Sequence, residues 1–378
     1  MSIIFYNSHD IFIKHANREK LKEIPGGEMF SLYFKVFSQN ITAVDRTNTI
    51  TTPLDVSVLP HLQMPQFKSF TSTFEEICDN RAQELMFYAK KTGRKLAVMY
   101  SGGIDSTLIL CALLKNCSEH DIKSNVVVLL SNASIRENPN FFYNYVIKKF
   151  NCVSSFRYTH FLGNDNYVFV SGENGDQLFG SQVVSAFTQD RPFADVFKNI
   201  NNMEGELINW MYKTTFKFNE PQYTKQHIEQ LFFIFKKIVD AAPVKLDTVY
   251  KFFWWINFTT KWHSVYVRPL PFSKNLNTIK FEENYTTFYC TKEFQLWAMN
   301  KHDSFIKDTP DTAKYVSKDY IFKYNKDLEY LKKPKIGSLW RMFRQKNIPF
   351  TLDQNLKANY NYPDNTMYNY SNDFMEIK

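Results

Sequence analysis

The chain has 378 residues, 44% of them hydrophobic and 22% charged, proportions typical of a globular protein with a proper core. Its net charge of +8 is spread along the chain, which favours a phosphate-handling enzyme over a dedicated nucleic-acid binder. The five cysteines form no C-x-x-C pair, which argues for a reducing compartment and against a zinc ribbon or iron–sulfur site. We find no signal peptide and no bilayer-spanning apolar run, so we expect a cytoplasmic protein without a membrane partner.

The first 71 residues contain short strand-like segments, at residues 3–6, 30–36 and 54–59, separated by turn signals. They predict a small N-terminal region that is β-rich or α+β. A capping box at residues 73–76 then predicts a helix through Lys91, with Gly93 as its stop.

A short apolar strand at residues 96–100 leads into the loop SGGIDS, residues 101–106, and an apolar helix is expected from about Thr107. The two glycines let the backbone approach an oxyanion, Ser101, Ser106 and Thr107 offer hydroxyls, and the helix N-terminus adds free N–H groups. Asp105 would repel phosphate unless a divalent cation lay between them, so the loop predicts Mg²⁺ together with a nucleotide. An ordinary Gly-Gly turn, the alternative, does not account for the serines and the aspartate.

Strands and helices alternate after this loop. Residues 125–130, 156–158 and 167–170 are predicted strands, and residues 140–150 a helix. This alternation predicts a doubly wound parallel sheet of the α/β class. From about residue 190 the pattern is helical, most clearly at residues 222–241, and residues 351–378 are expected to form a weakly ordered tail.

A second strand–glycine loop–helix pattern, YVFVSGENGDQLFGS, occupies residues 167–181. In a doubly wound sheet, loops at the carboxyl ends of neighbouring strands face one ligand-binding crevice. Two acidic loops that converge there can hold Mg²⁺ against a triphosphate.

The first motif resembles the SGGxDS signature of the ATP pyrophosphatase (PP-loop) superfamily, whose members cleave ATP between its α- and β-phosphates. The second resembles the SGEGxDExFGG motif of asparagine synthetases and β-lactam synthetase. The resemblance covers residues 72–345 and implies a synthetase domain over residues 72–350, with an adenine nucleotide α-hydrolase-like fold. It also implies ATP and Mg²⁺ as cofactors.

The resemblance assigns Asp105 and Asp176 to Mg²⁺. Glu173 is implied as the carboxylate near the acyl-adenylate, and Lys335, in KPKIG, matches the lysine of the family's R-x-K motif. The segment 312–315 loosely resembles the helix start that precedes this lysine. The residues implied in nucleotide binding are Ser101, Gly102, Gly103, Asp105, Ser106 and Gly172.

Each role has a structural alternative. Asp105 and Asp176 can be turn aspartates, Glu173 can be a helix N-terminal acid, and Lys335 can belong to a solvated charge run with its lysine neighbours. For His263 and Arg268 we favour a packed helix over a pocket lining.

Two departures from the family bear on the substrate. Gln177 replaces the acidic residue after the second aspartate, and Ser181-Gln182 replaces the closing Gly-Tyr. The sequence begins Met1-Ser2 instead of Met-Cys, and too few residues precede the first helix for a glutaminase domain. We therefore expect free ammonia, a separate ammonia-supplying or substrate-carrying protein, or another amine as the nitrogen source. Trp254, Trp255 and Trp262 are candidates to wall the acceptor site.

The sequence thus predicts a ligase that adenylates a small carboxylate and transfers it to ammonia or another amine. One alternative is a nucleobase- or tRNA-modifying PP-loop enzyme, to which the basic charge is suited; salt-dependent nucleic-acid binding would indicate it. Another is a non-catalytic nucleotide-binding subunit of a larger complex.

Overall fold

The computed structural model describes most of the chain between residues 62 and 332 and a few short segments outside it. The described residues are 45–49, 62–155, 158–180, 184, 187–188, 190–216, 223–267, 269, 281, 283–307, 309, 312–332, 351–352 and 358–359. They divide into two compact units. Unit 1 comprises Met1–Thr71, Asn174–Lys274 and Cys290–Lys314; unit 2 comprises Ser72–Glu173, Asn275–Tyr289 and Tyr315–Lys378. The predicted N-terminal strands lie outside the described residues.

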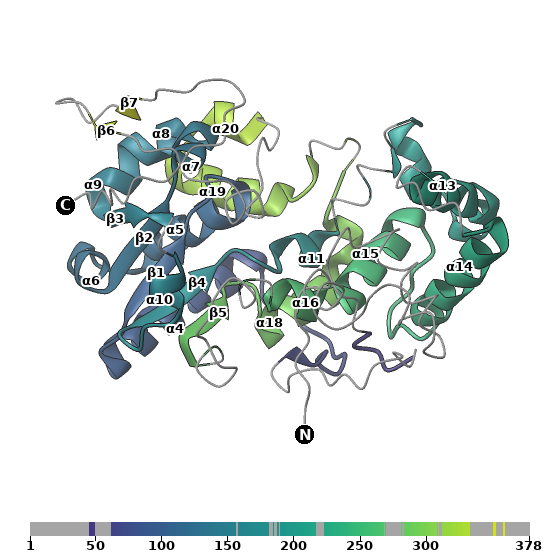
Figure 1. Cartoon of the computed structure of the whole chain (residues 1–378), viewed down its shortest axis with the longest axis horizontal. Coiled ribbons are helices and arrows are strands. Elements are labelled where there is room, and N and C mark those ends of the chain that lie inside the picture. The colour runs from purple at the N-terminus through teal and green to yellow at the C-terminus, as the bar shows by residue number, and fades with distance from the viewer. Residues whose placement is uncertain are drawn as a thin grey trace. The chain divides into compact units, whose positions relative to one another are not determined.

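Unit 2 is built on a five-stranded, all-parallel sheet, which confirms the predicted α/β class with a parallel sheet (Figure 1). The strand order is β3-β2-β1-β4-β5, so β1 lies at the centre between β2 and β4. The strands are β1 (Lys95–Met99), β2 (Val126–Leu130), β3 (Asn151–Ser154), β4 (Tyr167–Ser171) and β5 (Tyr285–Thr287). All five residues of β2 are buried, as a parallel strand covered on both faces requires.

The helices of unit 2 follow and precede these strands. They are α4 (Phe74–Thr92), α5 (Ile104–Asn116), α6 (Glu119–Asn125), α7 (Asn132–Glu137), α8 (Pro139–Phe141), the π-helical turn η3 (Phe142–Val146), α9 (Ile147–Lys149), α10 (Tyr158–Leu162), α19 (Tyr315–Asn325) and α20 (Leu328–Lys332). The predicted capping box is present: Glu76 N donates to Thr73 Oγ1, and Thr73 N donates to the Glu76 carboxylate. Gly93 ends α4 in the left-handed conformation, as predicted.

Two boundaries differ from the sequence prediction. Helix α5 begins at Ile104, three residues before Thr107, so Asp105 and Ser106 lie in its first turn. Of the predicted strand at 156–158, residues 156 and 157 lie outside the described residues, and Tyr158 begins the helix α10 and belongs to no strand. The apolar spacing of so short a segment does not separate a strand from one helical turn.

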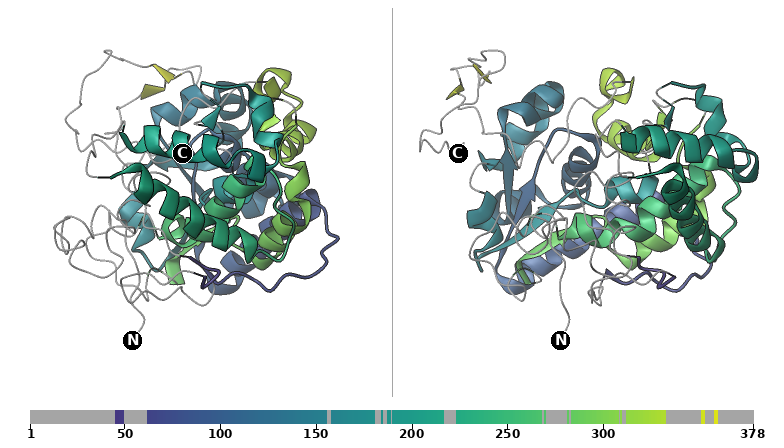
Figure 2. Two further views of the ribbon diagram at one scale, coloured as in Figure 1. Left: turned by 90° about the vertical axis from the view of Figure 1, so that its right-hand side faces the viewer. Right: turned by 45° about the vertical axis from the view of Figure 1, so that its right-hand side comes forward.

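Unit 1 is helical in its described part. Its elements are α11 (Gly175–Phe179), the 3₁₀ turns η5 (Phe193–Phe197) and η6 (Ile200–Asn202), α13 (Glu204–Phe216), α14 (Lys225–Asp240), α15 (Val249–Thr260), α16 (Trp262–Tyr266), α18 (Lys292–Lys301) and the 3₁₀ turn η8 (His302–Ser304). Helices α13 and α14 pack side by side (Figure 2). The predicted helix at 222–241 is thus confirmed as α14, with small differences at its ends.

Aromatic side chains form the core of unit 1. Trp254, Trp255 and Trp262 are fully buried, and the Trp254 ring stacks on His302 at 5.2 Å. The expectation that these tryptophans wall an acceptor site is therefore wrong; they fill the space between helices. His263 is also fully buried, in agreement with the favoured packed-helix interpretation, and Arg268 lies outside the described residues.

A buried arginine ties the segment 45–49 into unit 1. Arg46 donates to Phe258 O at 2.8 Å and to Gln295 Oε1 at 2.7 Å, and its guanidinium lies over the Trp262 ring at 4.7 Å. Burial lowers the pKa of Arg46 to about 9. Several hydrogen bonds and aromatic faces thus replace the water that this cation loses.

In the predicted tail, the described residues form a short antiparallel ladder, β6 (Thr351–Leu352) with β7 (Ala358–Asn359). Within the described parts of the chain, no helix combines the length and apolar character needed to cross a membrane.

Candidate functional site

The first glycine loop connects β1 to α5 at the carboxyl edge of the sheet. Its hydroxyl groups hydrogen-bond within the loop. Ser106 Oγ accepts from Ser101 N at 3.0 Å, lies 3.0 Å from Ser101 Oγ and donates to Gly103 O at 3.2 Å. Thr107 is fully buried, and its hydroxyl donates to Gly102 O at 3.2 Å. These side chains brace the loop, and their role as donors to a ligand stays a prediction.

Gly102 is the residue that permits this loop. Its φ of +75° lies in the left-handed region that glycine adopts without cost. A Cβ at this position would lie 2.3 Å from Ser134 O and 2.7 Å from Glu137 Cβ, both on α7. Loop and helix therefore approach more closely than any side chain at position 102 allows.

Helix α5 offers its N-terminus at this edge. Its N-cap is Gly103, and no side chain in the described part of the chain caps it. The first N–H groups of a helix need partners, and an anion is the ligand that the helix dipole favours. Asp105 lies in this first turn, only 9% exposed, and its backbone carbonyl accepts a hydrogen bond from the Tyr289 hydroxyl at 3.2 Å.

The second glycine loop begins beside the first. Strand β4 pairs directly with β1, so the two loops leave neighbouring strands in the same direction. A Cβ on Gly172 would lie 3.2 Å from Asp105 Cβ and 3.3 Å from Ser106 N, so the loops are in contact at this glycine. From β1 the chain continues to β2 and β3 on one side of β1, and then crosses to β4 on its other side. The carboxyl ends of β1 and β4 therefore form the topological switch point, where ligands of such sheets bind.

Glu173 follows Gly172 and is 6% exposed. Its backbone N–H donates to Ser171 Oγ at 3.3 Å, and that hydroxyl also lies 2.9 Å from the Tyr285 hydroxyl of β5. The structure thus places Gly172 and Glu173 in unit 2, at the same sheet edge as the first loop.

The second motif continues into unit 1 with Asn174 and helix α11. Asn174 adopts a left-handed φ of +67°, and its side-chain amide donates to Trp262 O at 2.9 Å. The backbone carbonyl of Asn174 accepts hydrogen bonds from the backbone N–H groups of Gln177 and Leu178, both at 3.1 Å. Asparagine tolerates this conformation better than most residues, which accounts for its place in the motif.

Helix α15 holds α11 by three side chains on one of its faces. Asn257 donates to Asp176 O at 3.0 Å, Trp254 to Leu178 O at 2.9 Å and Tyr250 to Phe179 O at 2.6 Å. Positions 250, 254 and 257 repeat at helical spacing, so they satisfy the carbonyls of a helix too short to be stable alone. The orientation of α11 is thereby set by tertiary contacts.

Gly180 ends α11 with a φ of +66°, and a Cβ there would lie 2.8 Å from Trp254 Cα. The glycine of this motif is therefore required by close packing of two backbones.

Asp176 pairs with Lys314, which lies outside both glycine-loop motifs. Lys314 Nζ lies 2.5 Å from Asp176 Oδ1, and the Lys314 side chain is 5% exposed. Lys314 has a left-handed φ of +59°, which is uncommon for a residue other than glycine. The only sequence signal for this residue was the loose match at 312–315. Asp176, whose carboxylate is predicted to bind a metal ion, is thus paired with the buried ammonium group of Lys314.

Asp105 belongs to unit 2 and Asp176 to unit 1, and Lys335 lies outside the described residues. Where the structure describes the chain, no group of three or more His, Cys, Asp or Glu side chains is placed to hold a metal ion. Magnesium in nucleotide sites commonly uses one or two carboxylates and completes its shell with phosphates and water.

Comparison with known proteins gives no family for this chain. No protein-family model, no curated protein and no solved structure matches it. A proposal of function therefore rests on the two motifs and on the geometry of the sheet edge where they begin.

Proposed function

We propose that this protein is an ATP-dependent ligase that forms AMP and pyrophosphate, adenylating a carboxylate and transferring the acyl group to ammonia or another amine. The observation that carries the proposal is the contact of the two glycine loops, Gly172 against Asp105, at the switch point between β1 and β4. It places Gly172, in the first part of the second motif, beside the first motif at one edge of the sheet.

The first loop is suited to a triphosphate. Gly102 keeps the backbone free of side-chain bulk, and the uncapped N-terminus of α5 presents N–H groups. Ser101, Gly103 and Ser106 form the hydrogen-bonded frame that holds these groups in place. Preorganised donors of this kind stabilise charge that develops on a phosphate, without rearranging as the reaction proceeds.

Mg²⁺ fits the chemistry of the carboxylates in the two motifs, since it prefers hard oxygen ligands. We assign Asp105 and Asp176 to it, as the resemblance implies. When bound, the ion neutralises the phosphates. Without a ligand, Asp176 is paired with the Lys314 ammonium, so Mg²⁺ would have to compete with this ammonium for the carboxylate.

Glu173 is the candidate for orienting the attacking amine, because it is a buried carboxylate one residue after the contact glycine. Lys335 is the candidate for stabilising charge on the reacting centre. If it acts only as charge develops, Lys335→Ala should lower kcat far more than it weakens ATP binding. An equal loss of ATP affinity would instead indicate a simple phosphate clamp.

An ATP–pyrophosphate exchange screen over amino acids and other carboxylates tests the proposal. With Mg²⁺ and the correct carboxylate, radioactive pyrophosphate should enter ATP, and the product after amine addition should be AMP. Formation of ADP and phosphate would refute the assignment. Asp105→Asn should abolish exchange, and Lys301→Met, a surface change on α18, serves as the control with unchanged exchange.

The net charge of +8 supports a second candidate, a PP-loop enzyme that adenylates an oxygen on a nucleobase. Tight RNA binding that weakens steeply with salt, combined with no exchange on any free carboxylate, would favour it over the ligase.

A further inference from the structure

Tyr330, on helix α20 of unit 2, is buried and contacts the first glycine loop. The Tyr330 hydroxyl lies 3.4 Å from Gly102 O and 3.4 Å from Thr107 Oγ1. Thr107 Oγ1 itself donates to Gly102 O, so the three groups form one small network around the left-handed residue of the loop. These distances are longer than the usual ~2.8 Å, so the network orients the loop with modest energy.

The hydroxyl of Tyr330 remains a donor over the physiological pH range. Tyr330 is only 8% exposed, and burial raises the pKa of its hydroxyl well above the ordinary value. A protonated hydroxyl in a buried position needs an acceptor, and Gly102 O and Thr107 Oγ1 are the acceptors within reach.

Helix α20, which carries Tyr330, is fixed at its start by Asp327. Tyr330 N donates to Asp327 Oδ1 at 2.9 Å, and Leu331 N donates to Asp327 O at 3.1 Å. Asp327 Oδ2 also accepts from Asn140 on α8, at 3.2 Å. The short helix is therefore attached to the same unit that carries the loop.

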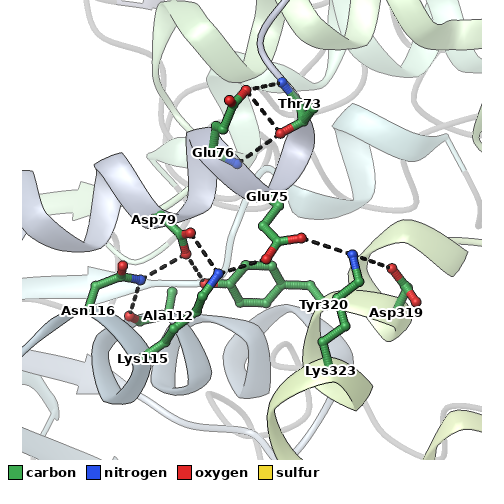
Figure 3. Close-up of polar contacts among 10 residues, drawn as sticks. All are labelled: Thr73, Glu75, Glu76, Asp79, Ala112, Lys115, Asn116, Asp319, Tyr320 and Lys323. Atoms are coloured by element: carbon green, nitrogen blue, oxygen red, sulfur yellow. Dashed lines mark hydrogen bonds and ion pairs between the residues drawn. The ribbon is translucent and has the colours of Figure 1, made fainter.

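Helix α19, which precedes α20, is held on α4 and α5 by a polar cluster (Figure 3). Lys115 of α5 lies 2.7 Å from both Glu75 and Asp79 of α4. From α19, Tyr320 donates to Asp79 at 2.5 Å and Lys323 lies 2.9 Å from Glu75. Such partly exposed polar contacts contribute little stability each, so α19 stays in place when a single contact of the cluster is removed.

We infer that Tyr330 is a positioning residue for the nucleotide-binding loop: through Gly102 O and Thr107 it holds the loop in the shape that receives ATP. The nucleotide part of this inference rests on the proposed function. The link between α20 and the loop does not, since it is a property of the protein without ligand.

The test compares Tyr330→Phe with Tyr320→Phe in the full chain. Each variant removes one hydroxyl from a tyrosine that is at least nine-tenths buried, but only Tyr330 contacts the loop. Hydrogen exchange of the amides at 101–107, measured without nucleotide, should be several-fold faster in Tyr330→Phe and unchanged in Tyr320→Phe. Calorimetric titration with Mg·ATP should show about three- to tenfold weaker binding for Tyr330→Phe only, as expected for one lost hydrogen bond.

Unchanged exchange at 101–107 in Tyr330→Phe would overturn the inference, and so would equal acceleration in both variants, which would indicate general loosening. If the wild-type protein binds no Mg·ATP, the proposed function fails, whereas the exchange comparison still decides whether Tyr330 holds the loop. Faster loop exchange with unchanged Mg·ATP affinity would overturn the nucleotide part alone.

Discussion

Replacing Gly102 with alanine tests the close approach of the first glycine loop to α7. The change adds one methyl group in a left-handed conformation, 2.3 Å from the backbone oxygen of Ser134. The matched control is Gly93→Ala. Gly93 has a similar φ of +69°, and no atom in the described part of the chain lies within 4 Å of its added Cβ.

The two variants share the cost of placing an L-residue in the left-handed region, about 1–2 kcal/mol. A more restricted unfolded chain offsets about 0.4–1 kcal/mol of that cost. Gly93→Ala should therefore lower the free energy of unfolding by roughly 1 kcal/mol. Gly102→Ala adds an overpacking cost of about 1–3 kcal/mol, because the obstacle is backbone and cannot rotate away.

Urea unfolding followed by circular dichroism measures both values, and calorimetry with Mg·ATP measures the loop directly. We expect Gly102→Ala to lose about 1–3 kcal/mol more than Gly93→Ala and to bind Mg·ATP at least tenfold more weakly, while Gly93→Ala binds normally. Equal destabilisation of the two variants would refute the close contact between loop and α7. Normal ATP binding by Gly102→Ala would remove this loop from the nucleotide site.

Three further variants test other parts of the molecule. Asp105→Asn should abolish pyrophosphate exchange while the far-ultraviolet circular dichroism stays unchanged; retained exchange would exclude Asp105 from the metal site. Lys314→Met should destabilise the protein by about 1–3 kcal/mol, since it leaves Asp176 without its cation, and a double-mutant cycle with Asp176→Asn should show strong coupling; additive effects would argue against the ion pair. The pKa of Asp247 is lowered to about 2, mostly by a hydrogen bond from Lys251 and then by one from Lys245. The stability that the ionised Asp247 contributes to the folded protein is therefore present above pH ~4 and is lost as the pH falls through 2. Asp247→Asn should thus be less stable than wild type at pH 6 by at most about 1 kcal/mol, and the difference should shrink toward zero as the pH falls below 2, as measured by urea unfolding at each pH.

The features that the sequence predicted well depend on neighbours within a few residues. The capping box at Thr73, the stop at Gly93 and the buried run of β2 are local patterns of hydrogen bonding, backbone freedom and hydrophobicity. The same holds for the two glycine loops, since each follows its strand and precedes a helix as the motif predicts.

Local patterns failed where the chain could adopt two structures or where only packing decides. The short segment 156–158 was predicted as a strand, but Tyr158 begins a helix. Trp254 and its aromatic neighbours were candidates for a site wall, because sequence composition does not separate a core from a pocket lining.

Taken alone, the sequence determined the α/β class, the positions of both glycine loops and the candidate residues within them. Only the tertiary structure decided which strands are neighbours, and hence that Gly172 packs against Asp105. It also decided the pairing of Asp176 with Lys314, 138 positions away, and of Gly102 with Tyr330, 228 positions away. Residues so far apart in the sequence meet only after the chain has folded, because their contact depends on the packing of every element between them.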